Sequence, residues 1–461
     1  MKPLPAPTAI PSDEELERCV ALLRSVEQWP EDHPARHAIE QAAIQVQRGQ
    51  KKRLRRQREK QRKQEDRSLV EGVFRAQTET LGVRSLSAPE PRTDSELRHP
   101  KHCYVCKQPF TRLHARYPLL CPPCADLNEA KREQRADLSG RSALITGGRT
   151  KVGFQLALKL LRDNARVLIT TRFPRDAARR FAAEPDFADW ADRLAVFGLD
   201  LRYLPGVKAF TEHLLATEPS LDILVNNAAQ TLRPTPEQLD SLRAHEQAAL
   251  LSPPASALLR GSTAFEAPTT GVGLLPVGAS ELLPLTQALA ERPDGNLEDR
   301  GSENSWVLRL HEVPFVELLE VQLINAVAPF LLNAHLKPLL LRSPHADRHI
   351  VNVSAVEGQF SRKNKTVFHP HTNMAKAALN MMTRTSAEDY ARDGIFMNSV
   401  DTGWLTNENP REKRLRMSEQ GFITPLDVVD GAARVYDPVV QGVRGQPVHG
   451  LFLKDYRSAP W

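Results

Sequence analysis

The chain has 461 residues, of which 41% are hydrophobic and 26% charged, and its formal net charge is +6. This length accommodates one large domain with small appendages. The N-terminus is proline-rich and then acidic, unlike a secretion signal, and we expect no apolar run near the ~20 residues that cross a bilayer. The composition therefore predicts a soluble cytoplasmic protein without a membrane partner.

The N-terminal region, residues 1–75, is predicted to be helical. Apolar residues recur on one stripe over residues 13–45. From Arg48 to Arg67 the chain is dense in Lys, Arg and Gln, which fits either a nucleic-acid-binding arm or a solvated helix. We favour the solvated helix, because Glu59, Glu65 and Asp66 dilute the charge and no aromatic side chain is present to stack on bases.

A polar, proline-containing linker is expected over residues 76–100, followed by a cysteine module over 101–136. Two Cys-x2-Cys pairs lie fourteen residues apart, at Cys103, Cys106, Cys121 and Cys124. Two such pairs are typical of a structural Zn²⁺ site closed by four thiolates. Disulfides are the alternative, but nothing in the sequence suggests secretion. We predict a zinc module that contacts a protein or nucleic acid or simply stabilises a small domain.

Residues 142–153 predict a phosphate-binding turn. The apolar run at 143–145 indicates a buried strand, Gly147 and Gly148 a tight turn, and Gly153 the start of an amphipathic helix. Glycines let the backbone approach a ligand closely, and the free N–H groups of a helix N-terminus attract an anion.

Further buried strands are expected at residues 167–170, 194–199, 221–225, 349–353 and 395–400, alternating with helical patterns. This alternation predicts an α/β fold, a Rossmann-like doubly wound parallel sheet, over residues 137–461. A long insertion at about residues 231–311 interrupts it. The insertion fits a lid, a partner-binding surface or a partly disordered segment, and we expect it on the substrate side.

In several spaced pieces the chain resembles the short-chain dehydrogenase/reductase family. These pieces are Thr146-Gly147…Gly153, Asp200, Asn226-Asn227-Ala228-Ala229, Asn325, Ile350 to Ser354, Lys376-Ala377-Ala378, and Asn398 to Gly403. The resemblance covers about residues 138–456. It implies a Rossmann-fold oxidoreductase that acts on a small molecule with a nicotinamide cofactor, and subunits that associate into a homo-oligomer.

The resemblance also implies which positions contact the cofactor. These are Thr146, Gly147 and Gly153 at the phosphates, Asp200 at the adenine, Asn226 and Ala228 at the adenosine ribose, and Lys376 at the nicotinamide ribose. After the second strand a carboxylate would select the 2′-hydroxyl of NAD, but this chain has Arg172 there. Arg149, Lys151 and Arg175 add positive charge, so we predict NADP rather than NAD.

The family's usual catalytic residues are only partly present. Asn325 and Lys376 match, but Thr372 stands where the family has its tyrosine, four residues before the lysine. Ala355 stands at the serine position, with Ser354 one residue early. Reduction of a carbonyl needs a proton donor, and a threonine hydroxyl is too weak an acid for that role.

Two histidines offer a substitute donor. His369 lies seven residues before Lys376, where the enoyl-reductase branch of the family has its tyrosine, and His371 adjoins the usual position. Histidine titrates near neutral pH, whereas the alternative is that both are loop residues without a chemical role. In this hypothesis His371 or His369 donates the proton, Lys376 holds the ribose, Asn325 supports Lys376 or a water, and Ser354 polarises the substrate.

The leading interpretation is therefore an NADP-dependent oxidoreductase with altered proton-donor chemistry. The alternative is a non-catalytic NADP(H)-binding scaffold or sensor. Such a scaffold would engage a protein or nucleic-acid partner through the zinc module and the basic helix.

Overall fold

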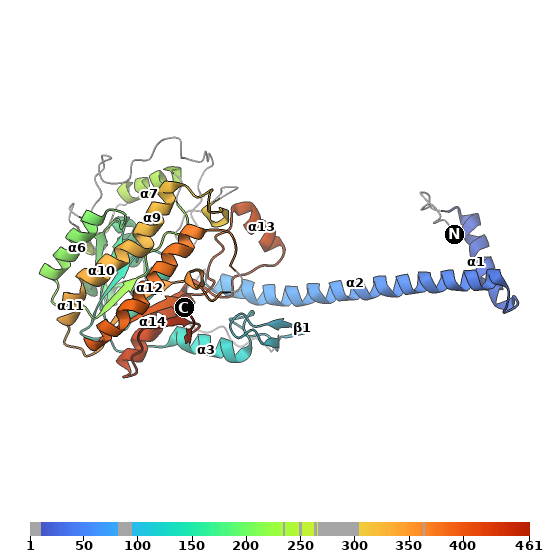
Figure 1. Cartoon of the computed structure of the whole chain (residues 1–461), viewed down its shortest axis with the longest axis horizontal. Coiled ribbons are helices and arrows are strands. Elements are labelled where there is room, and N and C mark those ends of the chain that lie inside the picture. The colour runs from blue at the N-terminus through green and yellow to red at the C-terminus, as the bar shows by residue number, and fades with distance from the viewer. Residues whose placement is uncertain are drawn as a thin grey trace.

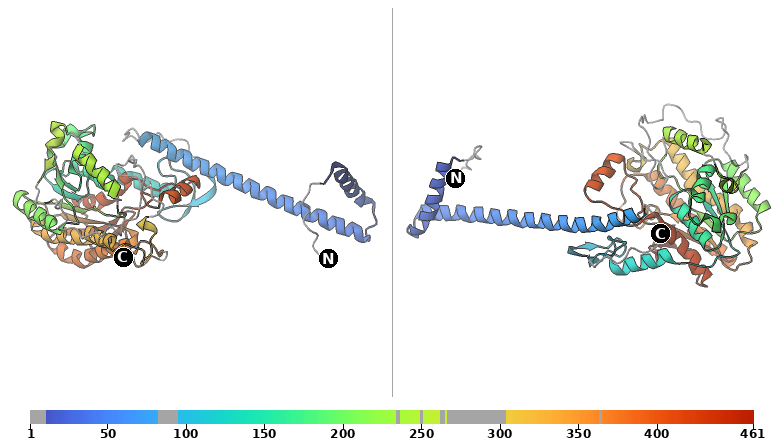
Figure 2. Two further views of the ribbon diagram at one scale, coloured as in Figure 1. Left: turned by 90° about the horizontal axis from the view of Figure 1, so that it is seen from above. Right: turned by 180° about the vertical axis from the view of Figure 1, so that it is seen from behind.

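The structure is a computed structural model that describes residues 11–81, 95–233, 236–248, 251–261, 265, 304–362 and 365–461. A globular α/β body carries a long helix, α2 (Pro34–Leu81), which projects away from it. The short helix α1 (Asp13–Ser25) lies at the far end of α2 (Figures 1 and 2). The helical region expected over 13–45 is thus two helices, because the prolines at 30 and 34 interrupt it.

The body is built on a nine-stranded sheet in the order β11-β10-β9-β8-β6-β3-β4-β5-β7. Its parallel strands are β3 (Ser142–Thr146), β4 (Arg166–Thr171), β5 (Leu194–Gly198), β6 (Ile223–Asn226), β7 (Leu259–Arg260), β8 (Arg348–Ser354), β9 (Ile395–Asp401) and β10 (Phe452–Lys454). β11 (Arg457–Ala459) pairs antiparallel with β10. The predicted Rossmann-like sheet is confirmed.

Helices cover both faces of the sheet. One face packs against α4 (Lys151–Arg162), α5 (Pro174–Ala182) and α14 (Val428–Val443). The other packs against α6 (Leu204–Thr217), α10 (Ala328–His335), α11 (Lys337–Leu341) and α12 (Pro370–Arg392). Successive strand residues serve opposite faces: Ile145 lies in the first core and Leu144 in the second. This two-sided burial explains why the strands are continuous apolar runs.

One helical run, Phe315–His335, has the length and hydropathy to cross a membrane, so the expectation of no such run was wrong. It comprises α9 (Phe315–Gln322), a π-helical turn (Leu323–Val327) and α10. Half of its apolar window is buried, and Ile324, Ala328 and Leu332 pack in the core beneath the sheet. The buried half of its apolar residues therefore belongs to the core of the domain, whereas Phe315 and Phe330 are exposed.

The first part of the insertion lies at an edge of the sheet. Helices α7 (Pro236–Ala248) and α8 (Pro253–Ser256) pack against α5, and β7 extends the sheet beyond β5. Glu246 of α7 accepts hydrogen bonds from the first-turn N–H groups of α5, at Arg175 (2.6 Å) and Asp176 (2.9 Å). Toward the end of the insertion, the carbonyl oxygens of Trp306 and Leu308 contact His369 at the start of α12. Residues 262–264 and 266–303 of the insertion lie outside the described residues.

The cysteine module consists of β1 (Glu96–His102), β2 (Pro109–Arg112) and α3 (Pro122–Glu133). The linker expected over 76–100 overlaps α2 at one end and β1 at the other. Asp66 of α2 accepts hydrogen bonds from the backbone N–H groups of Arg98 (2.8 Å) and His99 (3.1 Å). Val70 is buried in the apolar core of the module, so this end of α2 is fixed to it.

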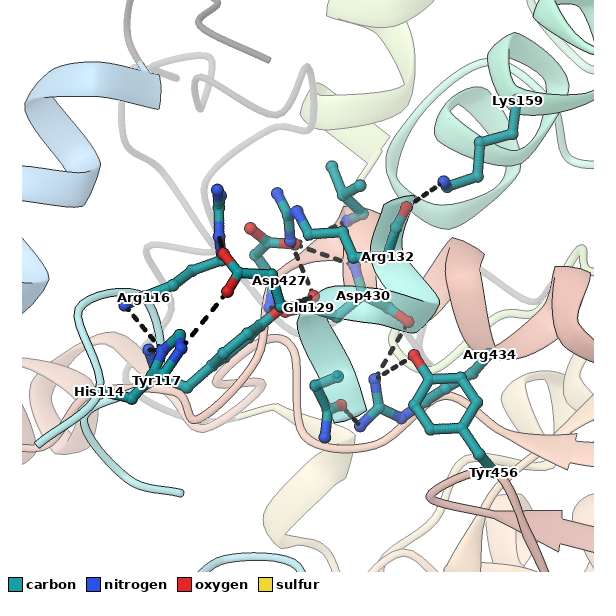
Figure 3. A network of polar contacts seen from close by, with 12 residues as sticks. His114, Arg116, Tyr117, Glu129, Arg132, Lys159, Asp427, Asp430, Arg434 and Tyr456 are labelled. Atoms are coloured by element: carbon teal, nitrogen blue, oxygen red, sulfur yellow. Dashed lines mark hydrogen bonds and ion pairs between the residues drawn. The ribbon is translucent and has the colours of Figure 1, made fainter. Parts of the chain in front are cut away.

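Helix α3 fastens the module to α14 through buried charges (Figure 3). Arg132 donates to Asp427 (2.7 Å) and Asp430 (2.8 Å), and the hydroxyl of Tyr117 donates to Asp430 (2.6 Å). The same two aspartates form the capping box that begins α14. Arg132 therefore neutralises a carboxylate pair that α14 needs in order to start.

Replacing Arg132 with alanine should lower the free energy of unfolding by about 3–5 kcal/mol, because it leaves buried carboxylates without a counter-charge. Chemical denaturation of the full chain measures this loss. The control is Arg98→Ala, which breaks an ion pair with Glu65 in which the Arg98 side chain is 60% exposed. That variant should lose no more than about 1 kcal/mol. Equal losses in the two variants would contradict the assignment.

Candidate functional site

The phosphate turn brings three backbone segments into close contact at the carboxyl end of β3. Gly147 has a φ of +69°, and a Cβ there would lie 2.9 Å from the Cα of Ala228. A Cβ on Gly153 would lie 2.3 Å from the carbonyl oxygen of Gly147 and 2.5 Å from Nδ2 of Asn227. Glycine is therefore sterically required at both positions.

Thr146 and Asn227 tie this turn to the end of β6. Oγ1 of Thr146 accepts hydrogen bonds from the N–H groups of Asn227 and Ala228, both at 3.0 Å. Nδ2 of Asn227 donates to the carbonyl oxygens of Thr146 (3.0 Å) and Gly147 (3.1 Å). Asn226 points elsewhere, donating to Asn333 and Asn352. The side chains of these predicted cofactor residues thus hold the loops, which leaves the backbone to face a ligand.

Lys151, the first residue of α4, has a left-handed conformation, with a φ of +53°. Its Nζ lies 3.7 Å from Oε1 of Glu408, on the loop that follows β9. A side chain in this conformation is strained, and such strain often accompanies function. Lys151 therefore bridges the phosphate turn to the β9 loop.

Two predicted cations converge beyond β4. The guanidinium groups of Arg149 and Arg172 lie 5.4 and 5.6 Å from the ring centroid of Phe173. Nη1 of Arg172 is buried and has no hydrogen-bond partner within the described part of the chain. Burial lowers the pKa of Arg172, and Asp200 partly opposes this shift. A buried cation with an unused donor fits an anionic ligand.

Sequence reasoning missed Asp176, which lies beside these cations. Burial opposes its ionisation, but hydrogen bonds from Arg180, Arg149 and Arg179 outweigh burial and lower its pKa to about 2. The spacing of Asp176 to Arg179 and Arg180 on α5 is the helical ion-pair pattern that would have revealed two of its partners. The sequence analysis named only the cations here, so it missed this carboxylate, which the three arginines neutralise.

Asp200, the predicted adenine contact, is paired with Arg202 through contacts of 2.6 to 3.1 Å. Burial opposes ionisation of Asp200, but Arg202 keeps its pKa below the usual value. Arg202 also donates to Glu320 of α9 at 2.9 Å. No sequence signal predicted the pairing of Arg202 with Glu320, because the two residues are distant in the chain.

Asn325 lies in the π-helical turn between α9 and α10. Its Oδ1 accepts from the N–H of Gln230 (2.8 Å) and its Nδ2 donates to the carbonyl of Gln230 (3.0 Å). The amide therefore fixes the loop that follows β6. π-turns are frequent at functional sites, where they re-aim a side chain.

Lys376 lies on α12, where its Nζ donates to the carbonyl oxygen of Val353 at 2.8 Å. Burial lowers its pKa to about 8. Thr372, one helical turn earlier, is buried, and its hydroxyl has no hydrogen-bond partner in the described ranges. Ser354, at the end of β8, donates to Asn380 at 2.6 Å. Its hydroxyl is thus directed at α12.

The two histidines differ in how they are held. His369 precedes α12 with a φ of +44°, and its ring stacks on Trp306 with centroids 4.0 Å apart and planes 7° apart. Its Nδ1 lies 2.9 Å from the carbonyl oxygen of Trp306. His371 is buried, and neither ring nitrogen has a partner among the described residues. Burial lowers the pKa of both rings, and that of His371 falls to about 4.

The four cysteines of the module converge as predicted. Their sulfur atoms all lie within 4.8 Å of one another, and those of Cys106 and Cys121 are 3.5 Å apart. An ideal tetrahedral site with Zn–S bonds of about 2.3 Å places sulfurs roughly 3.8 Å apart. The donor set and its spacing therefore fit one closed Zn²⁺ site. Cys19 is exposed on α1, outside this cluster.

Two family models match the Rossmann body. "Short chain dehydrogenase" matches residues 141–248, and "Enoyl-(Acyl carrier protein) reductase" matches residues 293–418. The first spans the phosphate turn through the end of β6. The second spans Asn325, the two histidines and Lys376.

Relatives extend this picture. An uncharacterised protein of Acanthamoeba polyphaga mimivirus is 32% identical over 73% of this chain and 71% of its own length. Human dehydrogenase/reductase SDR family member 13 is 34% identical over 23% of this chain, a match that spans only 26% of its length. The solved carbonyl reductase Sniffer of D. melanogaster is 18% identical, with a TM-score of 0.44 over 70% of this chain and 99% of its own. On its sequence matches, this chain belongs to the short-chain dehydrogenase/reductase family.

Proposed function

We propose that the protein is an NADP-dependent oxidoreductase that acts on a small-molecule carbonyl, alcohol or enoyl compound. The observation that carries this proposal is the glycine cradle at the end of β3, together with Arg172, whose buried Nη1 has no hydrogen-bond partner among the described residues. The cradle fits a pyrophosphate, since a side chain at Gly147 or Gly153 would close it. Arg172 and Arg149 would hold the 2′-phosphate, and Thr146, Asp200, Asn226 and Ala228 would frame the adenosine half.

Arg172→Ala should weaken NADPH binding by about 10- to 100-fold, the range expected for a lost hydrogen bond to a charged group. NADH lacks the phosphate, so its affinity should change little. Calorimetric titration of the full chain with both nucleotides measures the two effects. An equal loss for NADH would place Arg172 at the adenine, and tight NADH binding by the unaltered chain would reverse the assigned preference.

The nicotinamide cofactor, when bound, supplies or accepts the hydride. On the protein side, Lys376 is the donor available to its ribose, and the hydrogen bonds of Asn325 keep the neighbouring β6 loop in place. We assign the proton transfer to His369 rather than His371. The Trp306 ring stacks on the His369 ring, and the Trp306 carbonyl oxygen contacts its Nδ1. Nε2 is therefore the nitrogen that would exchange a proton with a substrate. His371 and Ser354 would then shape the site without transferring the proton.

His369→Gln should reduce NADPH consumption by about 100-fold or more, the typical contribution of a general acid. The assay uses a panel of aldehydes, ketones and enoyl thioesters. His371→Gln is the matched control and should retain most of the activity. Because the pKa of His369 lies below 6.5, reduction by the unaltered enzyme should accelerate as the pH falls from 8 to 7. Oxidation should slow only below that range.

The assignment of His369 as the proton donor would be contradicted if reduction lost its pH dependence in His371→Gln but kept it in His369→Gln. A chain that binds NADPH but consumes none with any compound in the panel would favour the scaffold interpretation.

The cysteine module would hold one structural Zn²⁺. Four thiols from two tight turns leave no open position, so a bound ion would stabilise the module and take no part in catalysis. The module has a small apolar core of its own, and a metal would supply much of its folding energy.

Elemental analysis of the purified chain should find one zinc per molecule. Cys121→Ser should abolish zinc binding and lower the thermal midpoint, because the ligand set becomes incomplete. Cys19→Ser is the control and should change neither, since Cys19 is exposed on α1. A full complement of zinc in Cys121→Ser would refute the site.

The same family resemblance supports a homo-oligomer. Phe330 on α10 and Met381 on α12 are 57% and 55% exposed, which is high for large apolar side chains. We propose that the outer surfaces of these two helices form the subunit interface.

A further inference from the structure

We propose that the basic segment of α2, residues 48–63, binds the phosphate backbone of duplex DNA. This inference is independent of the oxidoreductase proposal. The segment contains ten cations against the single acid Glu59. The cations are Arg48, Lys51, Lys52, Arg53, Arg55, Arg56, Arg58, Lys60, Arg62 and Lys63. Residues 50–64 are all exposed, and the segment extends clear of the body (Figures 1 and 2).

The acids that dilute this charge in the sequence are engaged elsewhere in the structure. Asp66 is buried, and its carboxylate accepts the backbone N–H groups of Arg98 and His99. Glu65 pairs with Arg98 at 3.2 Å. Asp66 is thus withdrawn from the surface, and Glu65, whose side chain is 40% exposed, is paired with a cation outside the segment. Residues 48–63 therefore present almost uncompensated positive charge. This arrangement reverses the preference for a merely solvated helix.

The charge on the segment also lacks internal compensation. Within the described chain, the ion pair between Glu59 and Lys63 at 2.8 Å is the one recorded for residues 48–63. Cations lie four residues apart at Arg48 and Lys52, and again at Arg58 and Arg62. Like charges at this spacing repel and destabilise a helix. A polyanion along the helix would remove the repulsion and release its own counterions.

The chemistry of the segment selects the polyanion. Leu54 is its one apolar residue of any size, so it has no face to insert into a lipid surface. It has no aromatic residue to stack on the bases of a single strand. A helix about 10–12 Å across fits the major groove of B-form DNA, which is about 12 Å wide, whereas the major groove of duplex RNA is too narrow. Sixteen residues span roughly 24 Å.

The way in which α2 is attached to the rest of the protein suits DNA binding. Asp66 and Val70 fix one end of α2 to the cysteine module, and β1 lies beside that end (Figure 1). The module adds an exposed cation at Lys107. The segment is therefore a rigid, positively charged rod, held at one end and open to a duplex along its length.

The test is fluorescence anisotropy of the full chain with a mixed-sequence DNA duplex of about 20 base pairs, over a salt series. The test variant is the triple substitution Arg53→Gln, Arg55→Gln and Arg56→Gln. The matched control removes three exposed cations from the body, outside α10 and α12, by Lys208→Gln, Arg260→Gln and Arg342→Gln. Circular dichroism verifies that both variants retain their helix content, and NADPH titration reports on the Rossmann body separately.

We expect the unaltered chain to bind the DNA duplex more tightly than an RNA duplex of the same sequence. Affinity should fall steeply with salt. The α2 variant should lose about one unit of the logarithmic salt slope per cation removed, with a roughly uniform loss of affinity across sequences. The body control should match the unaltered chain. The proposal is overturned if the two triple variants behave alike, if single-stranded or RNA probes bind more tightly, or if only poly-glutamate or anionic vesicles bind.

Discussion

The close approach of backbone at Gly147, Gly153 and Ala228 is the constraint on which the rest of the site depends. A Cβ on Gly153 would lie 2.3 Å from a carbonyl oxygen, so α4 can start where it does only because no side chain intervenes. That start places the N-terminus of α4 over the carboxyl edge of the sheet, where ligands of open α/β folds bind. Thr146 then ties the same turn to β6. Arg149 and Arg172 could contact a bound nucleotide only if this cradle holds its pyrophosphate.

The sequence predicted the parts of the fold that depend on local pattern. Each expected strand of the Rossmann body lies within two residues of an observed one at both ends, because strands buried on both faces read as apolar runs. The four cysteines also converge as their spacing predicts. The edge strand β7 was not expected, since two residues carry no periodic signal.

Ion pairing at the site could not be predicted in the same way. Glu320 reaches Arg202 across more than a hundred residues of sequence, and Glu246 reaches α5 from an insertion. Such contacts depend on how helices pack, which no local pattern encodes. The left-handed conformations of two residues at the site, Lys151 and His369, were equally hidden. Lys151 occupies a position where glycine would cost nothing, and His369 adopts its strained φ only because the Trp306 carbonyl and ring hold it.

The capping box of α14 joins two parts of the molecule that are distant in sequence. Asp430 accepts hydrogen bonds from Arg132 and Tyr117 of the cysteine module. The adjacent Gly431 packs so tightly on α4 that a Cβ there would lie 2.9 Å from the side chain of Val152. The N-terminal end of α14 therefore contacts both the cysteine module and the start of α4, which follows the phosphate turn. If zinc and a nucleotide bind as proposed, each would, by thermodynamic reciprocity, raise the affinity of the chain for the other through this shared helix end. The N-terminal end of α14 would then respond both to zinc binding and to nucleotide binding.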